Sequence, residues 1–189
     1  TEKELDSYNT EKRDIPYLIC HEVSGKSLEN IRYERIWEES PLPLDNPENA
    51  FRVISGDFVT TDDGTGIVHT APTFGADDYK AAKSAKPEVP PLQVLDKNGI
   101  KVPLVDLKGK FIDGIGLISG KYVKNEYYES DCIPEKSVDV EISIRLKELN
   151  RAFKVEKYSH SYPHCWRTDK PVLYYPMESW FIKMDSLSN

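Results

Sequence analysis

The stretch that decides the fold runs from residue 62 to residue 79 and reads Asp62-Asp63-Gly64-Thr65-Gly66-Ile67-Val68-His69-Thr70-Ala71-Pro72-Thr73-Phe74-Gly75-Ala76-Asp77-Asp78-Tyr79. Its pattern predicts an acidic turn, a short apolar strand ending at His69, a loop punctuated by proline and glycine, and a helix with an acidic first turn. His69 and Asp78 lie nine residues apart on either side of that loop. We expect the loop to bring them together as parts of one pocket wall.

Both residues also have an ordinary structural interpretation. An aspartate at a helix start usually caps exposed N–H groups or interacts favourably with the helix dipole. A histidine at the end of a strand is usually packed or half-exposed. The residue types alone therefore leave a structural role and a chemical role open for His69 and Asp78.

Other parts of the chain predict a mixture of short strands and helices. We expect strands over residues 17–23 and 51–59, and a hairpin in which residues 92–96 and 100–105 flank a turn at Asp96-Lys97-Asn98-Gly99. Helices are predicted over residues 76–86 and 135–152, where acidic starts and the spacing of apolar residues favour them. Residues 1–14 are polar and acidic, and we expect a frayed N-terminal segment there.

The order of residues in the central stretch narrows the choice of function. Gly64 to Pro72, followed by Phe74 to Tyr79, closely resembles the signature of the editing domain of isoleucyl-tRNA synthetases. Related valyl and leucyl editing domains share the Gly-Thr-Gly start and the later Asp, but they lack the His-Thr-Ala-Pro combination. A second string, residues 158–182, resembles the return strand by which the editing insertion rejoins the catalytic domain.

The resemblance implies a fold and a division of the chain. The fold would be mixed α/β and β-rich, with the barrel-like core of the valyl, isoleucyl and leucyl editing domains and peripheral helices. Residues 1–157 would form the editing domain, and residues 158–189 would return towards a catalytic domain absent from this chain. The implied reaction is hydrolysis of valine mischarged onto isoleucine tRNA, or of valyl-adenylate, as proofreading in translation.

The resemblance also implies roles for particular residues. Asp78 would hold the α-ammonium group of the substrate, and His69 would line the side-chain pocket, reject isoleucine and help to place water. These two are the candidate catalytic residues. The candidate substrate-binding residues are Gly66, Thr70, Ala71, Pro72, Phe74, Gly75, Asp77 and Tyr79. The implied partners are the 3′ acceptor end of isoleucine tRNA, the mischarged valine and the rest of the parent synthetase.

Composition is typical of a globular chain of one domain: 189 residues, 39% apolar and 30% charged. The net charge of −7 argues against a free-standing nucleic-acid binder, so any RNA contact must be local. Three widely spaced cysteines favour a reducing compartment, and no apolar run could span a bilayer, so we expect a cytoplasmic protein without a membrane partner. The absence of an initial Met suggests an excised fragment.

No cofactor is expected in this chain. It has neither the signatures of the class I ATP site nor a P-loop, and Lys183-Met184-Asp185-Ser186 does not replace them. ATP and Mg²⁺ would belong to the parent enzyme's absent catalytic domain. His160, His164 and Cys165 could suggest a metal cluster, but adjacent ligands without a Cys-x-x-Cys do not fit a structural zinc site, so we predict no metal.

One departure from the family pattern leaves alternatives open. The editing pocket of the family has a second wall, a Thr-rich segment with Pro-Trp, and Thr60-Thr61 precedes an acidic pair instead. We expect the isolated chain to be weakly active or inactive if that wall is missing. The alternatives are a non-catalytic module that docks the acceptor end of tRNA, and a valyl-type editing domain that clears threonine.

Overall fold

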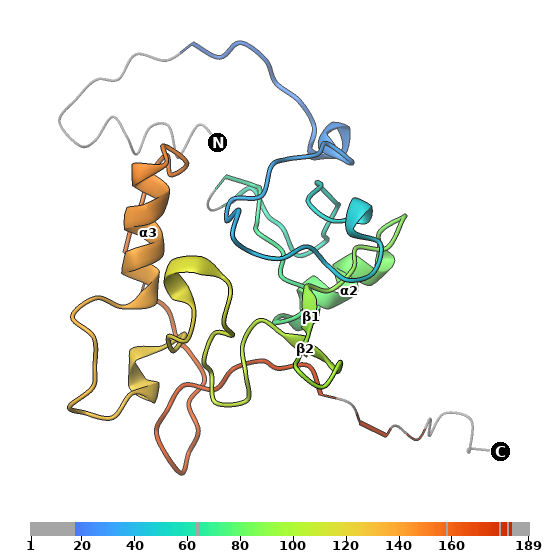
Figure 1. The fold of residues 1–189 in the computed structure, drawn as a ribbon. Helices are drawn as coiled ribbons and strands as arrows, with labels where there is room; N and C mark the ends of the chain where they lie inside the picture. Colours follow the sequence, from blue (N-terminus) through green and yellow to red (C-terminus); the bar gives the residue numbers. More distant parts are fainter. Residues whose placement is uncertain (1–17, 63–64, 158, 178, 181, 183–189) are drawn as a thin grey trace.

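The computed structural model describes residues 18–62, 65–157, 159–177, 179–180 and 182 (Figure 1). In chain order, its regular elements within these ranges are α2 (Ala76–Ser84), β1 (Gln93–Leu95), β2 (Lys101–Pro103) and α3 (Val138–Glu148). Short 3-10 helices cover Gly25–Leu28, Pro47–Asn49, Gly116–Ile118 and Asn125–Tyr127. The predicted N-terminal segment, residues 1–14, lies outside the described residues.

Helix α2 confirms the helix predicted from the acidic start and basic end of residues 76–86. Gly75 is its N-cap residue, Asp77 and Asp78 occupy the first turn, and Lys83 lies in the last turn. This distribution of charge matches the helix dipole, which favours anions at the N-terminus and cations at the C-terminus. The buried side chain of Ala82 faces the rest of the chain.

Helix α3 is shorter at both ends than the predicted range of 135–152, and its caps give the reason. The side chain of Ser137 accepts a hydrogen bond from the backbone N–H of Val140, which fixes the start. At the other end Asn150 adopts a left-handed φ of 56°. Its N–H donates to Lys147 and the N–H of Arg151 donates to Leu146, a Schellman motif that ends the helix.

The predicted hairpin is confirmed, with Val94 opposite Val102 in an antiparallel pair. Its turn depends on Asp96, whose carboxylate accepts hydrogen bonds from the N–H groups of Asn98 and Ile100, both at 2.8 Å. Gly99 has a φ of +78°, a conformation that glycine adopts without steric cost. The turn residues therefore set the register of the hairpin.

The strand predictions for residues 17–23 and 51–59 are wrong for the described residues. Residues 18–23 are exposed and irregular. In the second range Arg52 forms only an isolated bridge with Arg32, Phe51 has a φ of 53°, and the Val59 N–H closes a turn onto the Gly56 carbonyl. A β-prone run remains a strand only where a neighbouring strand pairs with its backbone groups along its length. Residues 51–53 bond to residues 30–33 over one short stretch only, and no such pairing involves residues 18–23 in the part of the chain that the structure describes.

The mixture of helix and strand is confirmed, whereas the barrel-like, β-rich core is not seen. Within the described residues the one sheet has two strands and is open. The main apolar cluster joins Ile115, Ile118 and Val138, with partly buried Trp37, Phe111, Ile112 and Ile142 packed against it. Figure 1 shows this part of the chain, the loop around Gly116–Ile118, beside α3.

Candidate functional site

The candidate site begins with a tight turn that leads into α2. The backbone N–H of Phe74 donates to the carbonyl of Ala71 at 2.9 Å, which closes a β-turn with Pro72 at its second position. The Tyr79 N–H then donates to the Gly75 carbonyl at 2.9 Å as the first bond of the helix. Loop and helix therefore form one continuous unit.

Asp78 closes this unit from the helix side. Its Oδ2 accepts a hydrogen bond from the backbone N–H of Ala71 at 3.1 Å, and its side chain is half-buried. The carboxylate lies so close to Gly75 that a Cβ there would collide with it. Oδ1 makes no hydrogen bond to any residue that the structure describes. One carboxylate oxygen thus has a structural role while the other is available to a ligand.

Thr73 and Phe74 attach the loop to the rest of the chain. Thr73 is buried, 5% exposed; its hydroxyl donates to the Leu92 carbonyl at 3.3 Å and accepts from the Leu92 N–H at 3.1 Å. The Phe74 ring packs edge-on against Tyr175 at 6.3 Å between centroids. Sequence reasoning missed the role of Thr73, because no local pattern signals a hydroxyl that pairs with a residue so far along the chain.

His69 does not lie at the end of a strand, contrary to prediction. Gly66 has a φ of +74° and the Thr65 hydroxyl accepts a hydrogen bond from the Ile67 N–H at 3.2 Å, so a turn replaces the strand. The His69 side chain is exposed, and no hydrogen bond joins it to Asp78. The hydrogen-bonding partner of Asp78 is therefore the backbone of Ala71, and the sharing of one pocket wall by His69 and Asp78 stays a prediction.

The remaining candidate residues divide by exposure. Those that are half-buried are Gly66, Thr70, Ala71, Pro72, Phe74 and Gly75. Asp77 and Tyr79 are exposed and contact lysines of α2: Asp77 pairs with Lys80 at 3.4 Å, and Lys83 lies 5.7 Å from the centre of the Tyr79 ring. These two residues belong to the solvated surface of α2.

A cleft of about 570 Å³ lies beside another face of α2. Asp77, Lys80, Ala81 and Ser84 line one side, and residues 29–30 and 52–58 line the other, so its lining includes neither His69 nor Asp78. Arg52, 8% exposed, holds this wall by donating hydrogen bonds to Asn30, Asn49 and Pro87. The chemistry of the residues places the candidate site at Asp78, and the cleft is a separate feature that the sequence did not indicate.

The arrangement can hold a cation at the Asp78 carboxylate. A half-buried carboxylate beside backbone N–H groups binds an ammonium group through a charge-assisted hydrogen bond.

Among the described residues, no group of three or more His, Cys, Asp or Glu side chains could hold a metal ion. In the same residues, no helix has the length and apolar character needed to cross a membrane.

Comparison with known proteins gives the chain a family. No family model matches. The chain is 51% identical over 190 residues to an isoleucine–tRNA ligase of Cytophaga hutchinsonii, covering 95% of the chain and 16% of that protein. The isoleucine–tRNA ligase of Porphyromonas gingivalis is 48% identical, with 94% of the chain and 16% of the protein covered. That of Clostridium tetani is 42% identical, with 92% and 14% covered.

All of these relatives are aminoacyl-tRNA synthetases, and this is the class of protein to which the chain belongs. Within this class the chain belongs to the isoleucine–tRNA ligase family and corresponds to a segment of it. The chain spans about one sixth of the length of the relatives that it matches. The resemblance drawn from the central stretch and from residues 158–182 is thereby confirmed at the level of the family.

Proposed function

We propose that the chain is the editing segment of an isoleucine–tRNA ligase and that it hydrolyses the ester joining valine to isoleucine tRNA. The hydrogen bond from the Ala71 N–H to Asp78 Oδ2 carries this proposal. It holds the Ala71–Phe74 turn against the first turn of α2 and places the Asp78 carboxylate beside that turn. Membership of the ligase family supports the choice of substrate.

A physical need for such a reaction exists in any isoleucine–tRNA ligase. A hydrophobic pocket gains only about 1–3 kcal/mol from one methylene, the difference between isoleucine and valine, a pair that is itself the standard example. That energy is too small for faithful translation. A second site that admits the smaller product and excludes the larger one supplies the missing discrimination.

In the proposed mechanism Asp78 binds the α-ammonium group of valine through Oδ1, while Oδ2 keeps its bond to Ala71. Fixing the ammonium group fixes the neighbouring ester carbonyl for attack by water. Hydrolysis breaks the ester bond, with valine leaving as the free acid and the ribose hydroxyl restored. His69, exposed just before the turn, would contact the larger side chain of isoleucine and help to place water.

The proposal extends to the organisation of the parent protein. Residues 1–157 would form the editing domain, around a barrel-like core completed by segments beyond those described, and residues 158–189 would return to the catalytic domain. The 3′ end of isoleucine tRNA and valyl-adenylate would be substrates, and a Thr-rich wall from another part of the ligase would complete the pocket. ATP and Mg²⁺ would serve the ligation reaction of the whole cytoplasmic protein.

The test compares two mischarged substrates with the correctly charged one. Isoleucine tRNA charged with valine, with isoleucine and with threonine is incubated with this chain and with a longer ligase polypeptide that contains it. Faster hydrolysis of the valyl ester than of the other two, in either protein, is the expected result. Preference for the threonyl ester would replace the proposal with a valyl-type function, and no hydrolysis in either protein would favour a docking module.

A further inference from the structure

Residues 163–172 form a hairpin whose base is fixed and whose tip is exposed. The Cys165 N–H donates to the Lys170 carbonyl at 2.8 Å, and the Val172 N–H donates to the Pro163 carbonyl at 3.1 Å. Pro171 is buried, and its carbonyl accepts a hydrogen bond from the Tyr127 hydroxyl at 2.6 Å. The base of this hairpin therefore belongs to the folded body.

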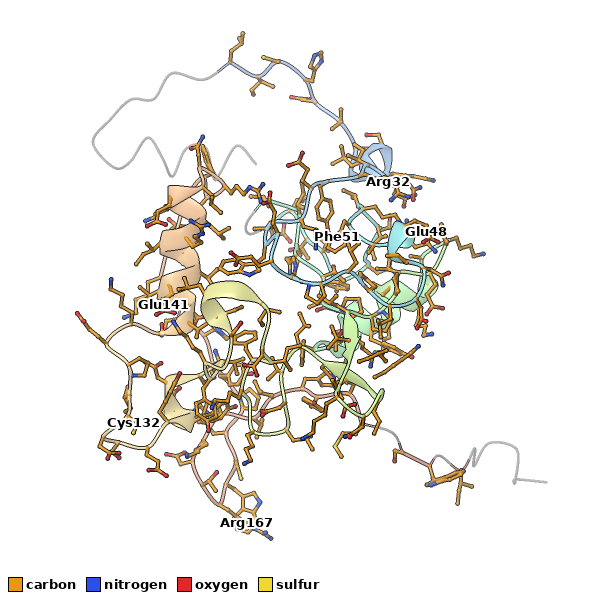
Figure 2. The ribbon with its side chains drawn as sticks, viewed as in Figure 1. Arg32, Glu48, Phe51, Cys132, Glu141 and Arg167 are labelled. Carbon is orange, nitrogen blue, oxygen red and sulfur yellow. The ribbon has the colours of Figure 1, made fainter. Side chains whose placement is uncertain are left out.

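The tip of the hairpin carries a large aromatic ring in solvent. Trp166 is 85% exposed, and the Arg167 guanidinium lies over its ring at 4.7 Å from the centroid. Figure 2 shows Arg167 at the far end of this loop, directed away from the body of the protein. An exposed tryptophan with a stacked guanidinium offers both a flat apolar surface and a positive charge to a ligand.

A row of rings leads up to this tip along the preceding strand-like segment. His160, Tyr162 and His164 alternate along the chain, and their rings make edge contacts at 6.1 Å and 6.3 Å between centroids. All three therefore share one face of an extended segment. Lys124 adds a second cation, with its Nζ 5.2 Å from the centre of the Tyr162 ring. We call these six residues the ring strip: Lys124, His160, Tyr162, His164, Trp166 and Arg167.

The local charge around the ring strip is opposite to that of the whole chain. Residues 151–170 contain five Lys or Arg residues against two acidic residues, whereas the chain has a net charge of −7. Two of these cations already have acidic partners, Arg151 with Glu38 and Lys154 with Glu156. Arg167 and Lys124 form no salt bridge with any residue that the structure describes, so both charges are available to an anionic ligand.

We propose that the ring strip binds unpaired nucleotides of RNA, with bases stacked on Trp166 and on the rings below it and phosphates held by Arg167 and Lys124. Alternating rings and cations are the combination by which proteins bind single-stranded nucleic acid without reading its sequence. A protein partner would need only the apolar surface and would leave the two cations unused. The proposal deepens the proposed function, on which it rests for the choice of RNA, since a tRNA ends in unpaired nucleotides.

The ring strip also explains how an acidic chain can contact RNA at all. The excess of cations over acids in residues 151–170 reduces the repulsion that phosphates would meet on an acidic chain, and here the cations lie beside exposed rings. The base of the hairpin is anchored through Pro171 and Tyr127, so less of this segment has to become ordered when RNA binds. Its role is to position the RNA end and not to take part in the ester hydrolysis.

The experiment measures the fluorescence anisotropy of a labelled, unstructured RNA oligonucleotide of about ten nucleotides with this chain. Replacing Trp166 with Ala should weaken binding by roughly 5- to 150-fold, the loss expected for one stacked base. W166F should keep most of the affinity, and R167A should both weaken binding and reduce its salt dependence. Trp180→Ala is the matched control, because Trp180 is 99% exposed but lies outside the strip.

Each outcome supports the proposal or overturns it. Equal binding by the natural chain and W166A, equal losses in W166A and W180A, or equal affinity for a blunt RNA duplex would each overturn it. The oligonucleotide carries no amino acid, so Asp78→Ala should bind it normally. RNA binding by W166A therefore tests the ring strip alone. If the chain proved not to hydrolyse valyl-tRNA, the loss of RNA binding expected in W166A would be unchanged.

Discussion

The backbone N–H of Ala71 donates a hydrogen bond to Asp78 Oδ2 at 3.1 Å, to a residue seven positions further along the chain. This bond makes the carboxylate a part of the turn at Ala71–Phe74 as well as of the first turn of α2. An aspartate in the first turn of a helix is stabilised by the helix dipole and by nearby N–H groups. The structural and chemical interpretations of Asp78 are therefore compatible, because each uses a different oxygen.

Gly75→Ala tests whether the position of this carboxylate matters. Gly75 has a φ of −144°, which alanine adopts without strain, so the main consequence of a Cβ is collision with the Asp78 carboxylate. We expect hydrolysis of valyl-tRNA to fall while the far-UV circular dichroism stays unchanged. Gly25→Ala is the matched control, since nothing lies within 4 Å of a Cβ there. Full activity of G75A would show that the carboxylate can move without consequence.

Thr73→Val tests the attachment of the loop to Leu92. Valine has nearly the same shape but leaves the Leu92 carbonyl and N–H without their partner, at a cost of about 1–3 kcal/mol in the free energy of unfolding. Thr73→Ser keeps the hydroxyl and should lose only about 1 kcal/mol for the missing methyl group. Urea unfolding measures both. Equal stability of T73V and the natural chain would show that the hydrogen bonds between Thr73 and Leu92 do not stabilise the attachment of the loop.

Asp96 gives the hairpin a dependence on pH. The N–H of Ile100 and then those of Asn98 stabilise the ionised form and lower the pKa of the Asp96 carboxyl. Because the folded-state pKa is below the unfolded value, the stabilisation is present above about pH 4 and is lost as the pH falls through the lowered pKa. The urea midpoint of the natural chain should therefore approach that of D96N in acid. A difference that stays constant with pH would contradict this assignment.

The thiol of Cys165 should react faster than an ordinary cysteine at neutral pH. Hydrogen bonds from the Thr168 hydroxyl and from the N–H groups of Arg167 and Thr168 lower the pKa of Cys165, which increases the thiolate fraction at a given pH. In a background of C20S and C132S, Thr168→Val should shift the pH profile of iodoacetamide alkylation to higher pH. Thr168→Ser should not. Identical profiles for T168V and the natural hairpin would refute the role of the hydroxyl.

Elements with strong local signals could be predicted from the sequence. Helix α2 follows from its charge distribution, and the hairpin follows from Asp96-Lys97-Asn98-Gly99, because caps and turns depend on neighbouring residues. The end of α3 was placed too late because the left-handed Asn150 is stabilised by a Schellman motif that apolar spacing does not reveal. The position of Asp78 in the first turn of α2 could be predicted in the same way, whereas its role in binding the substrate rests on the resemblance to the family.

Features that depend on distant partners could not be predicted. The runs at residues 51–59 and 65–69 are rich in β-prone residues, yet strands need neighbours, and the sequence does not say which neighbour is present. The buried pairing of Thr73 with Leu92 and the buried guanidinium of Arg52 also join segments far apart in the chain. A pair of this kind leaves no periodic pattern along the sequence.

The most direct test of the proposed function is the rate of hydrolysis of valyl-tRNA by Asp78→Ala and Asp78→Asn in a ligase polypeptide that contains this chain. Asparagine keeps an oxygen to accept the bond from Ala71 but has no charge for the ammonium group. We expect kcat/KM to fall by about ten- to hundred-fold in both variants, the loss of one hydrogen bond to a charged group. Natural activity in D78N would show that Asp78 acts only through the shape of the loop, and would contradict its role as the anchor of the substrate.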